Sequence, residues 1–283
     1  MRARRGFALL FGVTTSLSTA RASAAQAFAL ARYPASTRDA GLGGAGAALV
    51  GDADALFANP AGIATIRHLA VAASYEPISG RTAFSSAALA LRVGRLELGG
   101  GAQTFGAAGK IASSDLLAAT SLVYRRGLIA LGVGGTYARA AGDSAGVWRG
   151  DVGLAVAVFD ILALGASVQQ IGGSALLPRR VRAGFTMNYT DPQGSYRLLS
   201  TLEGDWVAGA AAAVHAGIEA GFAVGGVGLV ARAGYASRGP LAGASRLTFG
   251  AGVNFGRVRL DYAYQDWNGP TAGRSRAGVR WML

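Results

Sequence analysis

The stretch that decides the fold is residues 257–267, RVRLDYAYQDW, in which apolar and polar side chains alternate. One side of an extended chain would carry Val258, Leu260, Tyr262 and Tyr264, and the other Arg257, Arg259, Asp261 and Gln265. A period of two residues is that of a β-strand, because a helix repeats its face every three to four residues. The stretch therefore predicts a strand with one apolar face and one polar face.

The same alternation recurs along most of the chain. Residues 274–281 place Arg274, Arg276 and Arg280 opposite Ala277, Val279 and Trp281. Similar units fall at 180–189 and near 68–76, 81–93, 95–104, 115–125, 127–139, 146–158, 161–171, 195–206, 210–222, 226–237 and 245–255. About fourteen strands of roughly 9–13 residues are typical of a transmembrane barrel, whose apolar face meets lipid and whose polar face lines a lumen. The predicted fold class is all-β, a transmembrane antiparallel β-barrel of about 14 strands over residues 68–283.

Two other folds fit parts of the sequence. A soluble β-sandwich or lipocalin-like barrel would need a well-charged outer face, yet only 15% of the residues are charged and Lys110 is the only lysine. A helical membrane protein could use the Ala/Gly-rich residues 207–231, but the arginines of residues 257–280 would each cost about 2.5–3.5 kcal/mol at the centre of a membrane helix. A barrel accommodates both features, because its charged side chains face the lumen.

The start of the chain predicts export. Arginines at positions 2, 4 and 5 precede an apolar run at 7–17, and Ala22-Ser23-Ala24 resembles a cleavage site, so residues 1–24 are predicted to be a cleaved signal peptide. The expected location is the bacterial outer membrane. Cysteine is absent, so disulfides and thiolate ligands are excluded. The net charge of +12 is spread over alternate positions instead of forming a patch, which argues against nucleic-acid binding.

Residues 40–62, AGLGGAGAALVGDADALFANPAG, contain the spacing G-x-G-x-x-G at Gly41, Gly43 and Gly46. A dinucleotide site needs a strand before this spacing and a helix after it, and the preceding LARYPASTRD has no strand pattern. Instead, Asp52 can cap a short helix that Asn59-Pro60 ends. Residues 25–67 are therefore predicted to form an N-terminal plug or hatch segment. Its predicted gating residues are Asp52, Asp54, Asn59, Pro60, Ala61 and Gly62.

Charged side chains on the predicted lumen face suggest a polar network. The carboxylates Glu203, Asp205, Glu219 and Asp261 are expected to pair with Arg182, Arg197, Arg232 and Arg259 across strands, and His215 is expected to join them. His215 and Glu219 share a face but lie about 13 Å apart along a strand, so they form no catalytic dyad by themselves. A Ser-His-acid hydrolase site stays conceivable, although no feature singles out a serine. We predict no catalytic, cofactor or metal site and no enzyme activity.

The motif GLGGAGAALVGDADALFANPAGIA, followed by the strand pattern, resembles the FadL superfamily of outer-membrane barrels, and in particular its PorV/PorQ-type branch. The closing FGRVRLDYAY and RSRAGVRW are similar to that family's last hairpin. The FadL resemblance implies a channel for hydrophobic small molecules gated by the plug. The PorV resemblance implies a non-channel barrel that acts as a shuttle or structural component of a type IX-like protein secretion system. The implied partners are outer-membrane lipid, the barrel-assembly machinery, and either hydrophobic small molecules or secretion-machinery proteins.

Overall fold

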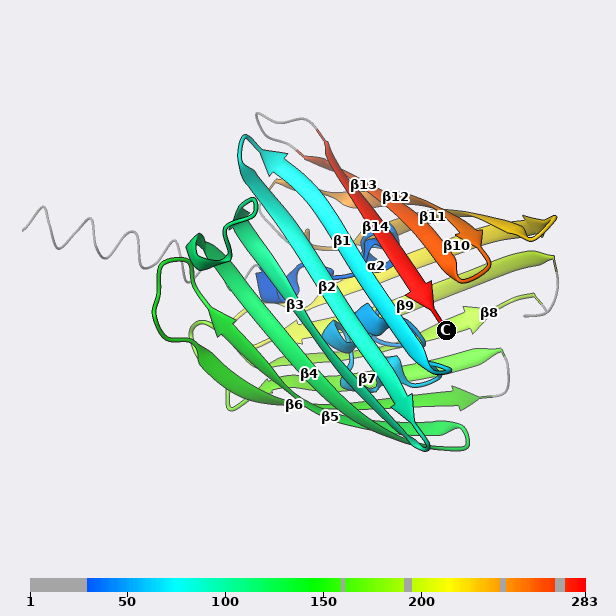
Figure 1. Ribbon diagram of the computed structural model, residues 1–283, viewed down its shortest axis with the longest axis horizontal. Coiled ribbons are helices and arrows are strands. Elements are labelled where there is room, and N and C mark those ends of the chain that lie inside the picture. The colour runs from blue at the N-terminus through cyan, green and yellow to red at the C-terminus, as the bar shows by residue number, and fades with distance from the viewer. Residues whose placement is uncertain (1–29, 159–160, 191–194, 240–242, 268–272) are drawn as a thin grey trace, which may run out of the picture.

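The computed structural model describes residues 30–158, 161–190, 195–239, 243–267 and 273–283. The expected signal peptide at 1–24, and residues 25–29 of the expected plug, lie outside these ranges. Within them the chain forms a closed antiparallel barrel in which each strand pairs with its neighbours in sequence (Figure 1). Strand β14 pairs with β1 and closes the wall. The all-β class and the predicted number of strands are confirmed.

The strands agree with the predicted units, and the largest differences at their ends are about three residues. The strands are β1 (Leu69–Ser79), β2 (Thr82–Val93), β3 (Leu96–Ala107), β4 (Ser114–Arg126), β5 (Ile129–Arg139), β6 (Val147–Val158), β7 (Leu162–Ile171), β8 (Arg180–Asn188), β9 (Tyr196–Val207), β10 (Ala213–Val224), β11 (Val227–Ala236), β12 (Ala244–Phe255), β13 (Val258–Trp267) and β14 (Arg274–Met282). The helical turns are α2 (Thr37–Gly41), η1 (Ala53–Phe57), η2 (Pro60–Ile63) and η3 (Ile111–Ser113). In the part of the chain that the structure describes, none of the helices combines the length and the hydropathy needed to cross a bilayer.

The two faces of the wall differ as the alternation predicts. On β13, Leu260 and Tyr262 are 49% and 44% exposed on the outside, whereas Asp261 and Ala263 are buried on the inside. The same holds for β14, where Arg276 and Arg280 are buried and point inward. The outer face is therefore largely apolar and the charged side chains of these strands lie in the lumen.

The two ends of the barrel have connections of different length. At the end where β1 begins and β14 finishes, the connections 94–95, 127–128, 225–226 and 256–257 have two residues each, 159–161 has three, and only 189–195 is long, with seven. At the opposite end the connection between β1 and β2 is short, but the others span 108–113, 140–146, 172–179, 208–212, 237–243 and 268–273. We call these the short-turn mouth and the long-loop mouth.

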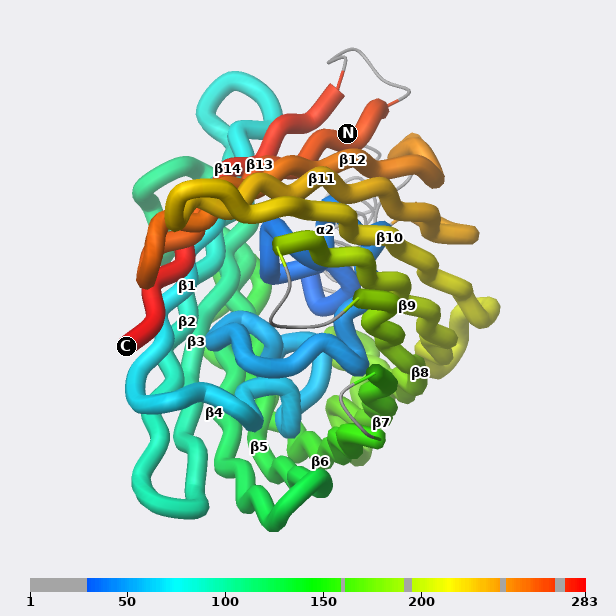
Figure 2. Tube along the Cα trace, turned by 90° about the vertical axis from the view of Figure 1, so that its right-hand side faces the viewer, coloured from blue at the N-terminus to red at the C-terminus, as the bar shows by residue number. Residues whose placement is uncertain are grey.

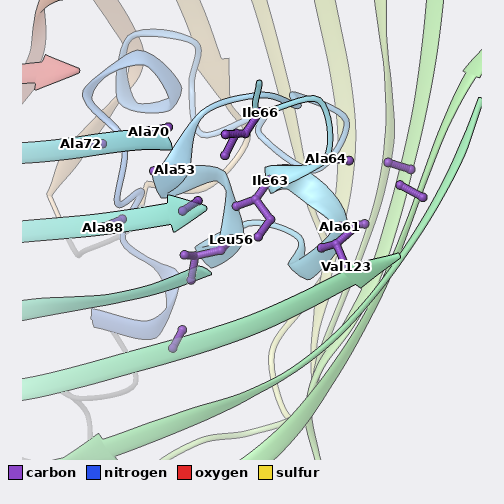
Figure 3. Packing of buried hydrophobic residues seen from close by; sticks show 14 residues of the cluster. Ala53, Leu56, Ala61, Ile63, Ala64, Ile66, Ala70, Ala72, Ala88 and Val123 are labelled. Carbon is purple, nitrogen blue, oxygen red and sulfur yellow. The ribbon is translucent and has the colours of Figure 1, made fainter. Parts of the chain in front are cut away.

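Residues 30–67, which we call the inner segment, lie inside the barrel (Figure 2). At the long-loop mouth Leu30 packs with Phe84 and Leu177 in one apolar cluster. At the short-turn mouth Ile63 and Val123 belong to a second cluster, formed by η1, η2 and the strands beside them (Figure 3). The inner segment therefore crosses the lumen from one mouth to the other before the chain enters β1.

Glycines on the inner wall allow the inner segment to approach closely. A Cβ atom added to Gly132 of β5 would lie 2.5 Å from the backbone nitrogen of Ala61, and one added to Gly217 of β10 would lie 2.8 Å from the carbonyl oxygen of Leu42. Real Cβ atoms do not approach other atoms so closely, so any side chain here would displace the inner segment. Other inward positions with the same property are Gly99, Gly101, Gly153, Gly165, Gly234 and Gly278.

Candidate functional site

The polar centre of the lumen is built around Glu219 of β10, whose side chain is almost fully buried. Arg38 of α2 donates from Nε to Oε2 of Glu219 at 2.9 Å and from Nη2 to Oε1 at 3.1 Å. Arg232 of β11 donates from Nε to the same Oε2 at 2.7 Å. A carboxylate that accepts from guanidinium forks makes charge-assisted hydrogen bonds, which are about twice as strong as neutral ones. Glu219 therefore connects the inner segment to the wall.

These contacts continue into a closed ring of alternating charges. Arg232 donates from Nη1 to Oδ1 of Asp261 at 2.7 Å, and Arg280 of β14 donates from Nε to Oδ2 of Asp261 at 2.9 Å. Arg280 also pairs with Asp52 of the inner segment, and Arg38 donates to Oδ2 of Asp52 at 3.2 Å. The ion-pair ring therefore consists of Arg38, Glu219, Arg232, Asp261, Arg280 and Asp52.

Two further predicted network residues lie beside the ion-pair ring. Nε of Arg197 is 2.9 Å from Oε1 of Glu219, so this pair forms across β9 and β10 as the sequence suggests. Arg259 differs, because its Nε donates to the side-chain oxygen of Asn254 on β12. Arg280, which was not among the predicted partners, binds Asp261 in its place.

A second group holds the backbone of the inner segment after α2. Arg182 of β8 donates from Nε to Oε1 of Glu203 on β9 at 2.5 Å, and from Nη2 to the carbonyl of Gly44 at 2.8 Å. The backbone N–H of Ala47 donates to Oε2 of Glu203 at 2.7 Å. The pair thus satisfies backbone groups of the inner segment that could not reach water inside the lumen.

The remaining predicted network residues lie closer to the long-loop mouth. Arg180 donates from Nε to Oδ1 of Asp205 at 2.8 Å and from Nη1 to the carbonyl of Ala31 at 2.9 Å. His215 donates from Nδ1 to the carbonyl of Gly43 at 2.7 Å, and its Nε2 is 3.7 Å from Oδ2 of Asp205. Asp205 therefore has both an arginine and a histidine beside it.

A third polar group at the long-loop mouth was not predicted from the sequence. Arg276 donates from Nε to Oε2 of Glu76 at 2.9 Å and also donates to the carbonyl of Pro34. The hydroxyl of Tyr33 donates to Oε1 of Glu76 at 2.5 Å. The alternation of residues 274–281 indicated that Arg276 faces the lumen, but no local pattern indicates Glu76 or Tyr33 as its neighbours.

The predicted gating residues lie in the second half of the inner segment. Asp52 stands at the N-cap position of η1, but its side chain makes no cap hydrogen bond there, so the expected capping role is wrong. Its carboxylate instead binds Arg38 and Arg280. Burial opposes its ionisation, but these two guanidiniums outweigh burial and hold the pKa of Asp52 below the usual range. Asp52 is therefore ionised in the lumen and pairs with Arg38 and Arg280.

Asn59 was predicted to end a helical turn, and in the structure it also caps the start of the next turn, η2. Its Oδ1 accepts from the N–H of Ala61 at 2.9 Å and so caps η2, while its Nδ2 donates to the carbonyls of Ala47 and Leu154 at 2.9 and 3.0 Å. The carbonyl of Pro60 accepts from Ser121 of β4 at 2.6 Å. The carbonyl of Gly62 accepts from the N–H of Gly51 at 2.8 Å. The Asn-Pro-Ala-Gly turn is thus bound to the wall and to its own segment.

Two carboxyl groups of the inner segment have raised pKa values. Burial raises the pKa of Asp54 to about 7, Arg280 lowers it in part, and the nearby carboxylates of Asp52 and Asp39 raise it further. One oxygen of Asp54 is buried and has no hydrogen-bond partner among the described residues. Burial likewise raises the pKa of Asp39 to about 6, against the opposing effect of Arg182. Both groups are therefore most stable in the lumen when they are protonated.

We expect the free energy of unfolding to contain a contribution from Asp39 and Asp54 that is lost as the pH rises from about 4 to about 7. Both carboxyls ionise near pH 3.8 in the unfolded chain but hold their protons to about pH 6 and 7 in the fold, so proton release favours unfolding across this interval. The charged groups that face them are Arg38, Asp52, Arg182 and Arg280.

Urea unfolding in detergent at about pH 4 and about pH 7 measures this contribution. The Asp54→Asn variant, which cannot ionise, should lose less stability than the wild type between the two pH values. Equal losses in both proteins would contradict the assignment.

Comparisons with known proteins support the fold. No protein-family model and no curated protein matches the sequence. Among solved structures, the toluene transporter TodX of Pseudomonas putida is similar with a TM-score of 0.59 at 11% identity, over 86% of this chain and 96% of TodX. The monoaromatic hydrocarbon channel CymD is similar with a TM-score of 0.58 at 13% identity, over 88% of this chain and 97% of CymD. At these identities the likeness shows the fold alone, a closed antiparallel barrel like those of the two channels.

Proposed function

We propose that the protein is an outer-membrane channel for small hydrophobic molecules, and that the inner segment closes its lumen and moves to open it. The observation that carries the proposal is the path of the inner segment, which crosses the lumen and binds the wall at both mouths. Two structural neighbours of the same fold are named as a toluene transporter and a monoaromatic hydrocarbon channel, which supports solutes of this class.

The outer face of the wall supports a membrane location. It exposes leucine, valine, isoleucine and phenylalanine side chains on most strands, and water-soluble proteins rarely leave a continuous apolar surface of this extent uncovered. Exposed aromatics near the strand ends include Tyr75, Trp148, Tyr196, Trp206 and Tyr235, and aromatic girdles of this kind mark membrane interfaces. Export by the proposed signal peptide and insertion by the barrel-assembly machinery would bring the chain to the outer membrane.

The lengths of the connections support one orientation of the barrel. Outer-membrane barrels have short periplasmic turns and longer extracellular loops. We therefore place the short-turn mouth, where β1 begins, on the periplasmic side and the long-loop mouth outside. The inner segment then enters the lumen at the extracellular side.

A disulfide between the inner segment and the wall tests the proposal. The hydroxyls of Thr37 on α2 and Ser74 on β1 are 2.8 Å apart, so cysteines at both positions should form a bridge, and the chain has no other cysteine. We expect vesicles that contain the oxidised Thr37→Cys/Ser74→Cys variant to take up toluene at least tenfold more slowly than wild type, and reduction to restore uptake. The control pair is Thr186→Cys/Thr201→Cys, which would bridge two wall strands whose hydroxyls are 3.2 Å apart.

A second candidate function is the non-channel barrel of a type IX-like secretion system. The feature that favours it is the number of charge-assisted contacts that fix the inner segment in the lumen. Such a barrel would take up toluene at the protein-free rate whether the bridge is open or closed, and it would co-purify with large secretion proteins. Both candidates use the lumen charges for positioning, so neither assigns them a catalytic role.

A further inference from the structure

The long-loop end of the lumen, which we propose to be extracellular, contains a cavity of about 50 Å³ between the inner segment, strands β8 to β14 and strand β1. A cavity of this size suits a compact group and not a long acyl chain. It lies beside residues of the first turn of the inner segment, including Tyr33 and Pro34, and reaches the connection between β11 and β12 at Arg238. Arg238 is exposed, so the cavity is approached from the long-loop mouth.

The lining of this cavity has more arginines than carboxylates. The arginines are Arg32, Arg180, Arg182, Arg238, Arg274 and Arg276, and the carboxylates are Asp39, Asp54, Glu76 and Asp205. Glu76 is bound by Arg276, Asp205 by Arg180, and Arg182 by Glu203, which lies outside the lining, so the excess comes from the other arginines. The two other carboxyls, on the inner segment, keep their protons above the usual pH range, which increases the positive excess.

Arg274 supplies donors that no described residue uses. Its side chain is only 10% exposed, yet neither Nε nor Nη1 has a hydrogen-bond partner among the described residues. The nearest carboxylate oxygen, Oε1 of Glu76, is 3.8 Å from Nη1. A buried donor without a partner costs about 1–3 kcal/mol, and more when it is charged. An acceptor inside the cavity would remove this cost.

The guanidinium of Arg274 is also held in place. It stacks over the ring of Trp267 with its central carbon 3.6 Å from the ring centroid. Stacking occupies the face of the guanidinium and leaves its in-plane N–H groups available, which is the geometry that binds the two oxygens of a carboxylate. The Arg274 guanidinium therefore needs little reorganisation to bind an anion.

Besides the polar side chains of His215, Thr248 and Gln265, the lining has an apolar and aromatic part. Tyr33, Phe57, Ala236, Ala263 and Tyr264 contribute to it. A purely inorganic anion would leave these groups without a partner, whereas an aromatic ring or short hydrocarbon chain would pack against them. The lining as a whole thus matches a molecule with one carboxylate and a small apolar body.

We propose that this cavity binds the carboxylate of a small aromatic or short-chain organic acid that enters from the extracellular side, with Arg274 as its main anchor. The proposal names the class of solute for the proposed channel. It rests on that function for the route through the barrel, but the binding step stands without it.

Calorimetric titration of the full chain in detergent with benzoate tests the proposal. We expect saturable binding of one benzoate per chain, and at least tenfold weaker binding of benzyl alcohol, which has the same ring and no carboxylate. Arg274→Gln should weaken benzoate binding at least tenfold. The matched control is Arg95→Gln, an exposed arginine in the 94–95 turn at the other mouth, which should leave the affinity unchanged.

Several outcomes would overturn the site. These are absent benzoate binding, equal affinity for benzyl alcohol, or an unchanged affinity in a folded Arg274→Gln variant. If that variant does not fold, Arg238→Gln at the rim is used, and it should weaken binding several-fold. If benzoate does not bind, but the disulfide between positions 37 and 74 still slows toluene uptake, the carboxylate site is refuted and the proposed channel function is retained. Benzoate binding without any uptake would refute the channel and leave the site standing.

Discussion

Replacing Glu219 by alanine is expected to lower the free energy of unfolding by about 3–5 kcal/mol, which is the usual cost of removing one partner from a buried ion pair. The variant leaves Arg38, Arg197 and Arg232 close together without the carboxylate that all three contact. Arg38 and Arg232 are buried, so water screens their mutual repulsion poorly, whereas Arg197 is partly exposed. Glu219→Gln keeps the shape but removes the charge, so it should lose an intermediate amount.

Urea unfolding of the detergent-refolded barrel measures the effect of the Glu219 variants. The control is Asp143→Ala, because Asp143 is an exposed loop carboxylate and its loss should change stability by less than about 0.5 kcal/mol. A Glu219→Ala variant as stable as that control would show that the ion-pair ring contributes nothing to the fold.

The double variant Arg38→Ala/Asp52→Ala is expected to release the inner segment from the wall while the barrel stays intact. It removes one positive and one negative charge, and leaves Glu219, Arg232, Asp261 and Arg280 paired with one another on the wall. Each lost contact to a charged group is worth about 1.5–3 kcal/mol. Because 1.4 kcal/mol is a factor of ten, the displaced population should rise at least a hundredfold.

Labelling of a cysteine at Ala45, which is completely buried, measures the displaced population. In the double variant a maleimide should label this position at least a hundredfold faster, and toluene uptake should rise. The matched control removes the same charges from exposed positions, as Arg246→Ala/Asp266→Ala, and should label at the wild-type rate. Faster labelling without faster uptake would contradict gating by the inner segment.

The strands could be predicted from the sequence because their signal is local. Alternation along β13 and β14 assigns each side chain to a face, and this is enough to place Asp261 and Arg280 in the lumen. The strand ends are harder to predict from the sequence, because residues such as Phe105 and Gly106 belong to β3 but do not continue its alternation of polar and apolar side chains.

The ion-pair ring could not be predicted, because its partners meet only when the barrel closes. Arg38 binds Glu219 across a sequence separation of 181 residues, and Arg38 lies in a segment with no strand periodicity. Asp52 shows the same limitation. Its position before a helical turn indicates a cap, and only the folded lumen shows that two guanidiniums compete for it more strongly than the backbone does.

The position of β14 has a consequence for biogenesis. It is the last of the described strands, and its pairing with β1 closes the barrel. It also carries Arg276 and Arg280, which bind the carbonyl of Pro34 and the carboxylate of Asp52 in the inner segment. If the barrel closed first, the inner segment would have to enter the lumen through one mouth. An open sheet can instead curve around an inner segment that already lies against it. We therefore expect the pairing of β14 with β1 and the enclosure of the inner segment to occur in the same step of folding.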